Sequence, residues 1–205
     1  MKRKFIIPLL LAGAPIIFFN CTTSTESSAA GADTTKTSSA TPNYGGYASQ
    51  TEWGKHLVTI TGCGDCHTPK KMTAQGPQED ADHILAGAVN PPLLPSITPE
   101  QVAKGTAATV DETAWIGPWG KSYAANITSD STGIGSWTEA QFINCLRNGK
   151  YMGLDSARPL MPPMPWRTYS QMTDDELKAM FAYLKSTKPV HNVSVPYEPP
   201  MMAKR

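Results

Sequence analysis

Two cysteines separated by two residues and followed at once by a histidine are the residues best suited to chemistry. They form the sequence Cys63-Gly64-Asp65-Cys66-His67, and this spacing is the attachment signature of a c-type haem. One helical turn places both thiols at the separation of the porphyrin vinyl groups, with which they form thioethers. The motif therefore predicts one covalently bound haem c, with Cys63 and Cys66 as thioether residues and His67 as an axial iron ligand.

Two other kinds of site use closely spaced cysteines. A thioredoxin-like redox pair lies between a strand and a helix, and nothing before residue 63 has the pattern of that strand. A structural zinc site needs a second pair of ligands, and Cys145 and the scattered histidines lack the required spacing. We therefore favour haem over both alternatives.

The sixth iron ligand decides what such a haem does, because an open site binds small molecules and a Met-filled site mainly transfers electrons. Residues 158–166 offer Met161 and Met164 in a proline-rich loop. Each proline fixes φ near −65°, which suits a loop that holds a thioether at a fixed distance from iron. A bis-His site is the disfavoured alternative, with three candidate histidines: His56, His83 and His191.

Three capped or periodic segments could position these residues. Apolar residues recur at intervals of three and four before Gly62, which predicts an amphipathic helix that leads into the motif and ends at Thr68-Pro69. This predicted buried stripe consists of Trp53, His56, Leu57 and Ile60. Capping boxes at 136–139 and 173–176 predict two further helices, the first ending at Gly149. The second has an apolar face of Leu177, Met180, Phe181 and Leu184.

The remaining segments give weaker signals. We expect residues 68–125 to form a long irregular connection, with a short helix capped at Thr98. The tail from Thr187 is expected to run extended over the surface. Cys145 is interpreted as a small, buried free thiol. Asn126 and Asn192 match the glycosylation sequon, which we discount as a modification signal here.

The N-terminal segment predicts export. Three cations and an interrupted apolar stretch over residues 1–20 are typical of a signal peptide. Cys21 follows directly, as in bacterial lipoproteins, although Asn20 stands where their motif has a small residue. Residues 21–47 are rich in Ser, Thr, Ala and Gly and predict a flexible tether. Loss of residues 1–20 changes the formal charge from +1 to −2, which argues against binding of nucleic acid.

Together these features resemble class I c-type cytochromes. The chain is similar to the single-haem modules in cytochrome subunits of membrane-bound alcohol, gluconate and aldehyde dehydrogenases, and to exported bacterial cytochrome c lipoproteins. The resemblance rests on four stretches, 54–69, 125–137, 142–149 and 158–184. It implies an all-α, cytochrome c-like fold of three or more helices around one haem, with long irregular loops. The family pattern of Met, Pro, an aromatic residue and a later Tyr matches Met164, with Met161 as the alternative ligand.

These inferences predict a signal peptide at 1–20, a lipidated Cys21 and tether at 21–47, and a cytochrome c domain at 48–205. The expected function is electron transfer, without catalysis or a small-molecule substrate, by a carrier that is anchored to a membrane in the periplasm or cell envelope. A dehydrogenase, a quinol-oxidising complex or an oxidase would be its redox partner. Two alternatives stay open: a haem enzyme or gas sensor with a dissociable sixth ligand, and a permanent subunit of a dehydrogenase.

Overall fold

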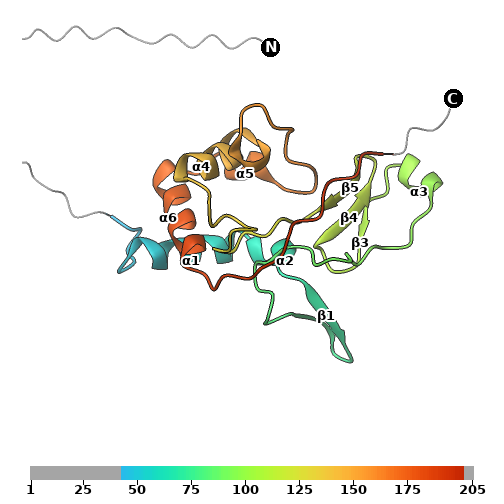
Figure 1. Cartoon of the computed structure of the whole chain (residues 1–205), viewed down its shortest axis with the longest axis horizontal. Helices are drawn as coiled ribbons and strands as arrows, with labels where there is room; N and C mark the ends of the chain where they lie inside the picture. Colours follow the sequence, from blue (N-terminus) through green and yellow to red (C-terminus); the bar gives the residue numbers. More distant parts are fainter. Residues whose placement is uncertain (1–42, 201–205) are drawn as a thin grey trace, which may run out of the picture. The chain divides into compact units, whose positions relative to one another are not determined.

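The computed structural model describes residues 43–200 (Figure 1). Its α-helices are α1 (Gln50–Ile60), α2 (Cys63–His67), α3 (Pro99–Ala103), α4 (Glu139–Asn148), α5 (Trp166–Tyr169) and α6 (Asp174–Lys185), and a 3-10 helix, η1, spans Tyr151–Gly153. The predicted signal peptide, Cys21 and most of the predicted tether lie outside the described residues. Within residues 43–200, no helix has the length and apolar character needed to cross a membrane.

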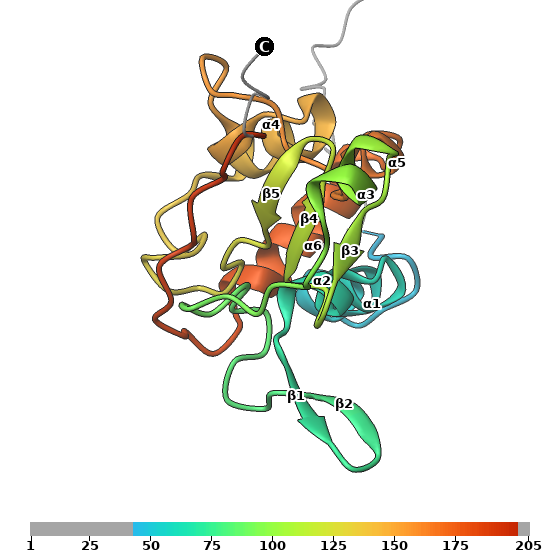
Figure 2. The ribbon, with the colours of Figure 1, turned by 90° about the vertical axis from the view of Figure 1, so that its right-hand side faces the viewer.

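The prediction of an all-α fold is wrong, because the structure contains two small antiparallel sheets. Helix accounts for 32% of it and strand for 13%. One sheet is the hairpin of β1 (Lys70–Thr73) and β2 (Gly76–Glu79), and the other has the order β3 (Ala108–Thr109), β4 (Ala114–Gly117), β5 (Gly120–Tyr123). The hairpin projects away from the other elements (Figure 2). All five strands therefore fall within the segment expected to be irregular.

The sequence did not predict these strands, because they are short and their apolar and polar residues show little alternation. The hairpin strands are mostly exposed, so their side chains show no apolar face. Their turns depend on glycines with positive φ, Gly76 at 101° and Gly120 at 103°, a conformation that glycine adopts without steric cost. The short helix capped at Thr98 is confirmed as α3, where Thr98 and Gln101 form a capping box.

Helices α1 and α6 pack closely and build one side of the hydrophobic core. The contact is centred on Gly54, where an added Cβ would lie 1.8 Å from the Ala179 carbonyl oxygen. The buried residues of α1 are Gly54, Leu57 and Val58, so the predicted stripe is wrong in part: Ile60 is 63% exposed. Of the predicted stripe, Leu57 is buried and Trp53 packs half-buried against the core, whereas His56 and Ile60 are exposed.

The two other predicted helices are present, with one corrected boundary. Thr173 caps α6 and forms a capping box with Glu176, as predicted. Helix α4 is capped by Thr138 instead of Ser136, because the Thr138 hydroxyl accepts from the Gln141 N–H at 3.2 Å. Gly149 ends α4 in the left-handed conformation with φ 62°, the usual C-terminal role of glycine.

The C-terminal segment, residues 187–200, returns from α6 across the molecule to β5 (Figures 1 and 2). The Asn192 side-chain amide donates to the Ala86 and Ala88 carbonyls at 2.7 and 3.0 Å. Glu198 forms an antiparallel bridge with Lys121 and also accepts from its ammonium group at 2.9 Å. The segment lacks helices and β-ladders, as expected of the tail, but its hydrogen bonds fix its course.

Asp80 anchors the loop that follows the β1–β2 hairpin. Its carboxylate lies 2.7 Å from the Lys71 ammonium and 2.8 Å from the His83 Nδ1. The hydrogen bond from Lys71 is the largest cause that lowers the pKa of Asp80 to about 2, and His83 adds to it. The ionised form is therefore stabilised by folding.

Replacing Asp80 with asparagine is expected to destabilise the protein at neutral pH and to have little effect near pH 2. A depressed folded-state pKa contributes stability above the unfolded-state value near 4, and this contribution is lost as the pH falls toward 2. Urea unfolding of wild type and variant at pH 7 and pH 2 measures the difference. Asp82, which is 82% exposed and 3.7 Å from Lys71, provides the control: Asp82→Asn should change stability by less than about 0.5 kcal/mol. A pH-independent effect of Asp80→Asn would contradict this interpretation.

Candidate functional site

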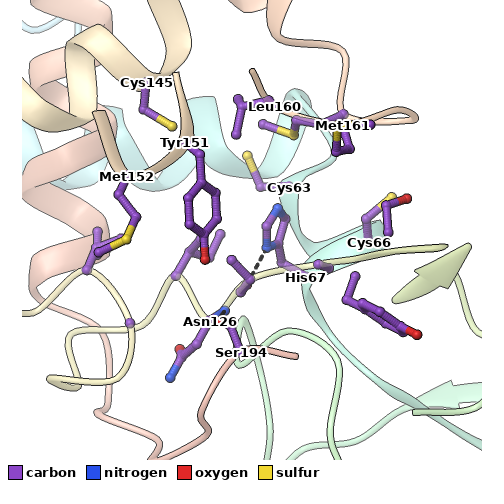
Figure 3. A pocket seen from close by; sticks show the side chains of 18 of the residues that line it. Cys63, Cys66, His67, Asn126, Cys145, Tyr151, Met152, Leu160, Met161 and Ser194 are labelled. Atoms are coloured by element: carbon purple, nitrogen blue, oxygen red, sulfur yellow. Dashed lines mark hydrogen bonds between the residues drawn. The ribbon is translucent and has the colours of Figure 1, made fainter. Parts of the chain in front are cut away.

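A cavity of about 380 Å³ lies against α2. Its walls come from α2, the strands β4 and β5, helix α4, the loop of residues 158–165 and the C-terminal segment (Figure 3). The lining is mainly apolar and contains the side chains of Cys63, Cys66, His67, Met161 and Met164. The structure thus brings the sequence-predicted thiols, imidazole and thioethers to one cavity.

Helix α2 is a single short turn that presents the motif to this cavity. Gly62 starts it in the left-handed conformation with φ 68°, so the predicted single helix is divided at Thr61 and Gly62 into α1 and α2. Helix α2 ends at His67, directly before Thr68-Pro69, where the stop was predicted. Burial is the largest cause that raises the pKa of Cys63 and also that of Cys66, and neither forms a disulfide. Redox-active cysteine pairs have a lowered thiol pKa, and the direction here is the opposite.

His67 is oriented by a backbone carbonyl. Its Nδ1 lies 2.7 Å from the Ala125 oxygen (Figure 3), and because a carbonyl only accepts, Nδ1 carries the hydrogen. Burial lowers the pKa of His67, which favours the neutral imidazole. The second ring nitrogen, Nε2, then keeps its lone pair, and this is the form of histidine that ligates metals.

Asn126, the residue after this carbonyl, joins its own loop to the C-terminal segment. It is 2% exposed. Its Oδ1 accepts from the Thr128 N–H and hydroxyl at 2.9 and 2.7 Å, and its Nδ2 donates to the Val190 carbonyl at 2.8 Å. Its backbone N–H donates to the Ser194 hydroxyl at 3.2 Å. The Asn126 side chain, which the sequence offered as a glycosylation site, is therefore buried, and both its oxygen and its nitrogen are hydrogen-bonded. These bonds hold the C-terminal segment beside Ala125, the residue that orients His67.

The loop of residues 158–165 is fixed at several points. The Leu160 N–H donates to the Gly149 carbonyl at 2.7 Å, and the Ser122 hydroxyl donates to the Pro162 carbonyl at 2.5 Å. Met161 and Met164 are both half-buried and line the cavity. Met164 also packs against the hydrophobic core. Both candidate methionines thus lie at the site, and the preference for Met164 stays a prediction.

The other candidate residues have structural surroundings. His56 packs on Tyr47 with ring centroids 5.1 Å apart, and His83 pairs with Asp80. His191 lies 3.6 Å from Asp130; none of the three histidines lines the cavity. Cys145 is buried at the cavity wall, where burial raises the pKa of its thiol to about 11. Within residues 43–200, no three His, Cys, Asp or Glu side chains are grouped to hold a metal ion.

Sequence reasoning missed part of the cavity wall. Tyr151 and Met152 of η1 line it, as do Arg158, strand β5 and residues 193–195 with Tyr197. Met152 has φ 56°, which is uncommon for a residue other than glycine. No sequence period marks these positions, because they belong to loops and to strands too short to show one.

Comparison with known proteins gives partial matches. No protein-family model matches the chain. A stretch of 75 residues, 36% of this chain, is 41% identical to the fructose dehydrogenase cytochrome subunit of Gluconobacter japonicus. A stretch of the same length is 40% identical to the cytochrome c subunit of the quinone-dependent alcohol dehydrogenase of Gluconacetobacter polyoxogenes. A stretch of 67 residues, 32% of this chain, is 37% identical to the gluconate 2-dehydrogenase cytochrome c subunit of Pantoea cypripedii.

The matched stretches are short parts of these relatives. They cover 15% of the fructose dehydrogenase cytochrome subunit, 15% of the alcohol dehydrogenase cytochrome c subunit and 14% of the gluconate 2-dehydrogenase cytochrome c subunit. Over about a third of its length, the chain is therefore similar to the cytochrome subunits of dehydrogenases.

Proposed function

We propose that the chain transfers electrons through one c-type haem held in the cavity. Cys63 and Cys66 would form its thioethers, and His67 and Met164 would be its axial ligands. The observation that carries this proposal is the convergence of two thiols, an imidazole and thioether side chains on one mainly apolar cavity. Soft sulfur and imidazole donors suit haem iron, so the residues present fit the group.

A bound haem supplies reversible one-electron chemistry. The chain's own residues restrict what else happens there. The Ala125 carbonyl holds the Nδ1 hydrogen of His67 and keeps Nε2 directed to the cavity. The anchored loop of residues 158–165 keeps a thioether at the site, where it would compete with water and small ligands. The mainly apolar lining disfavours water as an iron ligand, which favours a fixed ligand set over substrate turnover.

The setting of this carrier is part of the proposal. Residues 1–20 would direct export, Cys21 would carry the lipid, and the tether of residues 21–47 would link it to the cytochrome c domain at 48–205. The carrier would then work at a membrane in the periplasm or cell envelope. Similarity to cytochrome subunits of dehydrogenases supports a dehydrogenase as one redox partner; a quinol-oxidising complex or an oxidase would be the other. Co-purification from membranes distinguishes a free carrier from a permanent subunit.

The optical spectrum of the purified protein tests the haem proposal. We expect haem to stay with the chain on a denaturing gel and the oxidised form to show a Met-to-iron charge-transfer band. Cys63→Ala/Cys66→Ala should lose the gel-resistant haem. Rapid carbon monoxide binding by the reduced protein, without the Met band, would instead support an enzyme or sensor with a dissociable ligand.

Met164→Ala is expected to abolish the Met-to-iron band and to allow carbon monoxide to bind, because it removes the sixth ligand. Met161→Ala serves as the matched control, since both residues line the same cavity from the same loop. It should keep the band. Near-infrared absorption of the two oxidised proteins gives the comparison, and loss of the band in Met161→Ala alone would assign the ligand to Met161.

A further inference from the structure

Arg158 lines the cavity, and within the described part of the chain no other lysine or arginine does. The side chain is half-buried, and its guanidinium carbon lies 4.1 Å from the centroid of the Tyr151 ring and 5.3 Å from that of Tyr197. Tyr151 belongs to η1 and extends into the cavity (Figure 3), while Tyr197 belongs to the C-terminal segment. Two aromatic rings from separate segments thus fix the guanidinium at the cavity wall.

This guanidinium has unused hydrogen-bonding capacity. Arginine has five N–H donors and keeps its charge in proteins. One bond is formed, from an Arg158 terminal nitrogen to the Pro159 carbonyl at 3.0 Å. Among the described residues, no carboxylate lies within 4.0 Å of it. Glu112, the acidic residue of the lining, is 2.9 Å from the Lys70 ammonium, and Glu198 is paired with Lys121.

Stacking on two aromatic rings holds this half-buried cation at the cavity wall. It also leaves the planar edge of the guanidinium open to a ligand. That edge matches a carboxylate, which it binds through two parallel hydrogen bonds. The proposed occupant of the cavity carries two such groups, its propionates.

We propose that Arg158 binds a haem propionate carboxylate, with Tyr151 and Tyr197 holding the guanidinium in place. This inference rests on the proposed function, because it needs haem in the cavity. Arg158 would orient the propionate edge of the haem at this wall, while Cys63 and Cys66 attach the haem covalently. A carboxylate from another source, such as an acidic partner protein, would instead leave the haem propionates unaffected by Arg158.

Redox-induced infrared difference spectroscopy of the holoprotein tests this assignment, because it reports the carboxylate bands of propionates directly. Arg158→Leu is expected to shift these bands, and Arg158→Lys to shift them less because it keeps the charge but loses the planar edge. Removal of a nearby cation also favours the ferric state, so Arg158→Leu should lower the reduction potential relative to wild type. Arg167→Leu is the matched control: it removes an exposed arginine that stacks on Trp166 at 5.0 Å and lies outside the cavity lining.

The possible outcomes separate this inference from the proposed function. Shifted carboxylate bands in Arg158→Leu, with wild-type bands in Arg167→Leu, support it. A protein with covalent haem whose carboxylate bands are the same in all variants overturns the role of Arg158 and leaves electron transfer intact. A purified chain without haem overturns both. Circular dichroism of each variant ensures that a band shift does not come from unfolding, and the Arg158→Lys variant keeps the test valid if Arg158→Leu fails to fold.

Discussion

Gly54→Ala is expected to lower the free energy of unfolding by about 3 kcal/mol, the upper end of the usual cost of overpacking. The new methyl group would lie 1.8 Å from the Ala179 carbonyl oxygen and 2.5 Å from its carbon. These are backbone atoms of α6, so no side-chain rotation relieves the overlap, and α1 and α6 must separate. The loss of packing between the helices exceeds the gain in helix propensity of about 1 kcal/mol.

Thermal unfolding of the holoprotein measures this effect, and the midpoint should fall by roughly 6–12 °C for a chain of this size. Gly64→Ala is the matched control. Gly64 is also helical, but its added Cβ would meet no atom closer than 3.8 Å. We expect no loss of stability there and a gain of up to about 1 kcal/mol from helix propensity. Equal midpoints for Gly54→Ala and wild type would show that the two helices can separate without cost.

Asn126→Ala is the second substitution with a large expected effect, also about 3 kcal/mol. It would leave buried hydrogen-bonding groups of Thr128 and the Val190 carbonyl without their partner, and each such group costs about 1–3 kcal/mol. The C-terminal segment would lose a main attachment. Hydrogen exchange should therefore show loss of protection over residues 190–198 in addition to the lower stability.

Asn148→Ala controls for the removal of an asparagine amide. Asn148 is exposed and donates one hydrogen bond, to the Asn144 side chain at 2.6 Å, so its loss should cost less than about 0.5 kcal/mol. If Asn126→Ala were destabilised while residues 190–198 kept their protection, Asn126 would not be what holds the C-terminal segment.

The sequence predicted those features that depend on neighbouring residues. The spacing of Cys63, Cys66 and His67 fits one helical turn, and the capping boxes at Thr98 and Thr173 each need only four residues, so these elements follow from local rules. The lone misplaced cap, at α4, is an error of two residues between Ser136 and Thr138.

Features that depend on distant segments could not be predicted. The buried face of α1 is set by the close approach of Ala179 to Gly54, and these two positions are far apart in the sequence. The orientation of His67 depends on the Ala125 carbonyl, 58 residues later. The strands were missed for a different reason: pairing between such short segments, as of Ala108 with nearby Ile116, leaves no periodic signal within either one.

The path of the C-terminal segment has a consequence for the order of folding. Residues 193–195 and Tyr197 complete the cavity wall, and Asn192 ties them to Ala86 across 106 positions of sequence. Cys63, Cys66 and His67 belong to one local helical turn, whereas this wall forms only when a segment distant in sequence docks. Before docking, the cavity is open on that side, and a large planar group has a path to the two thiols that the docked segment narrows.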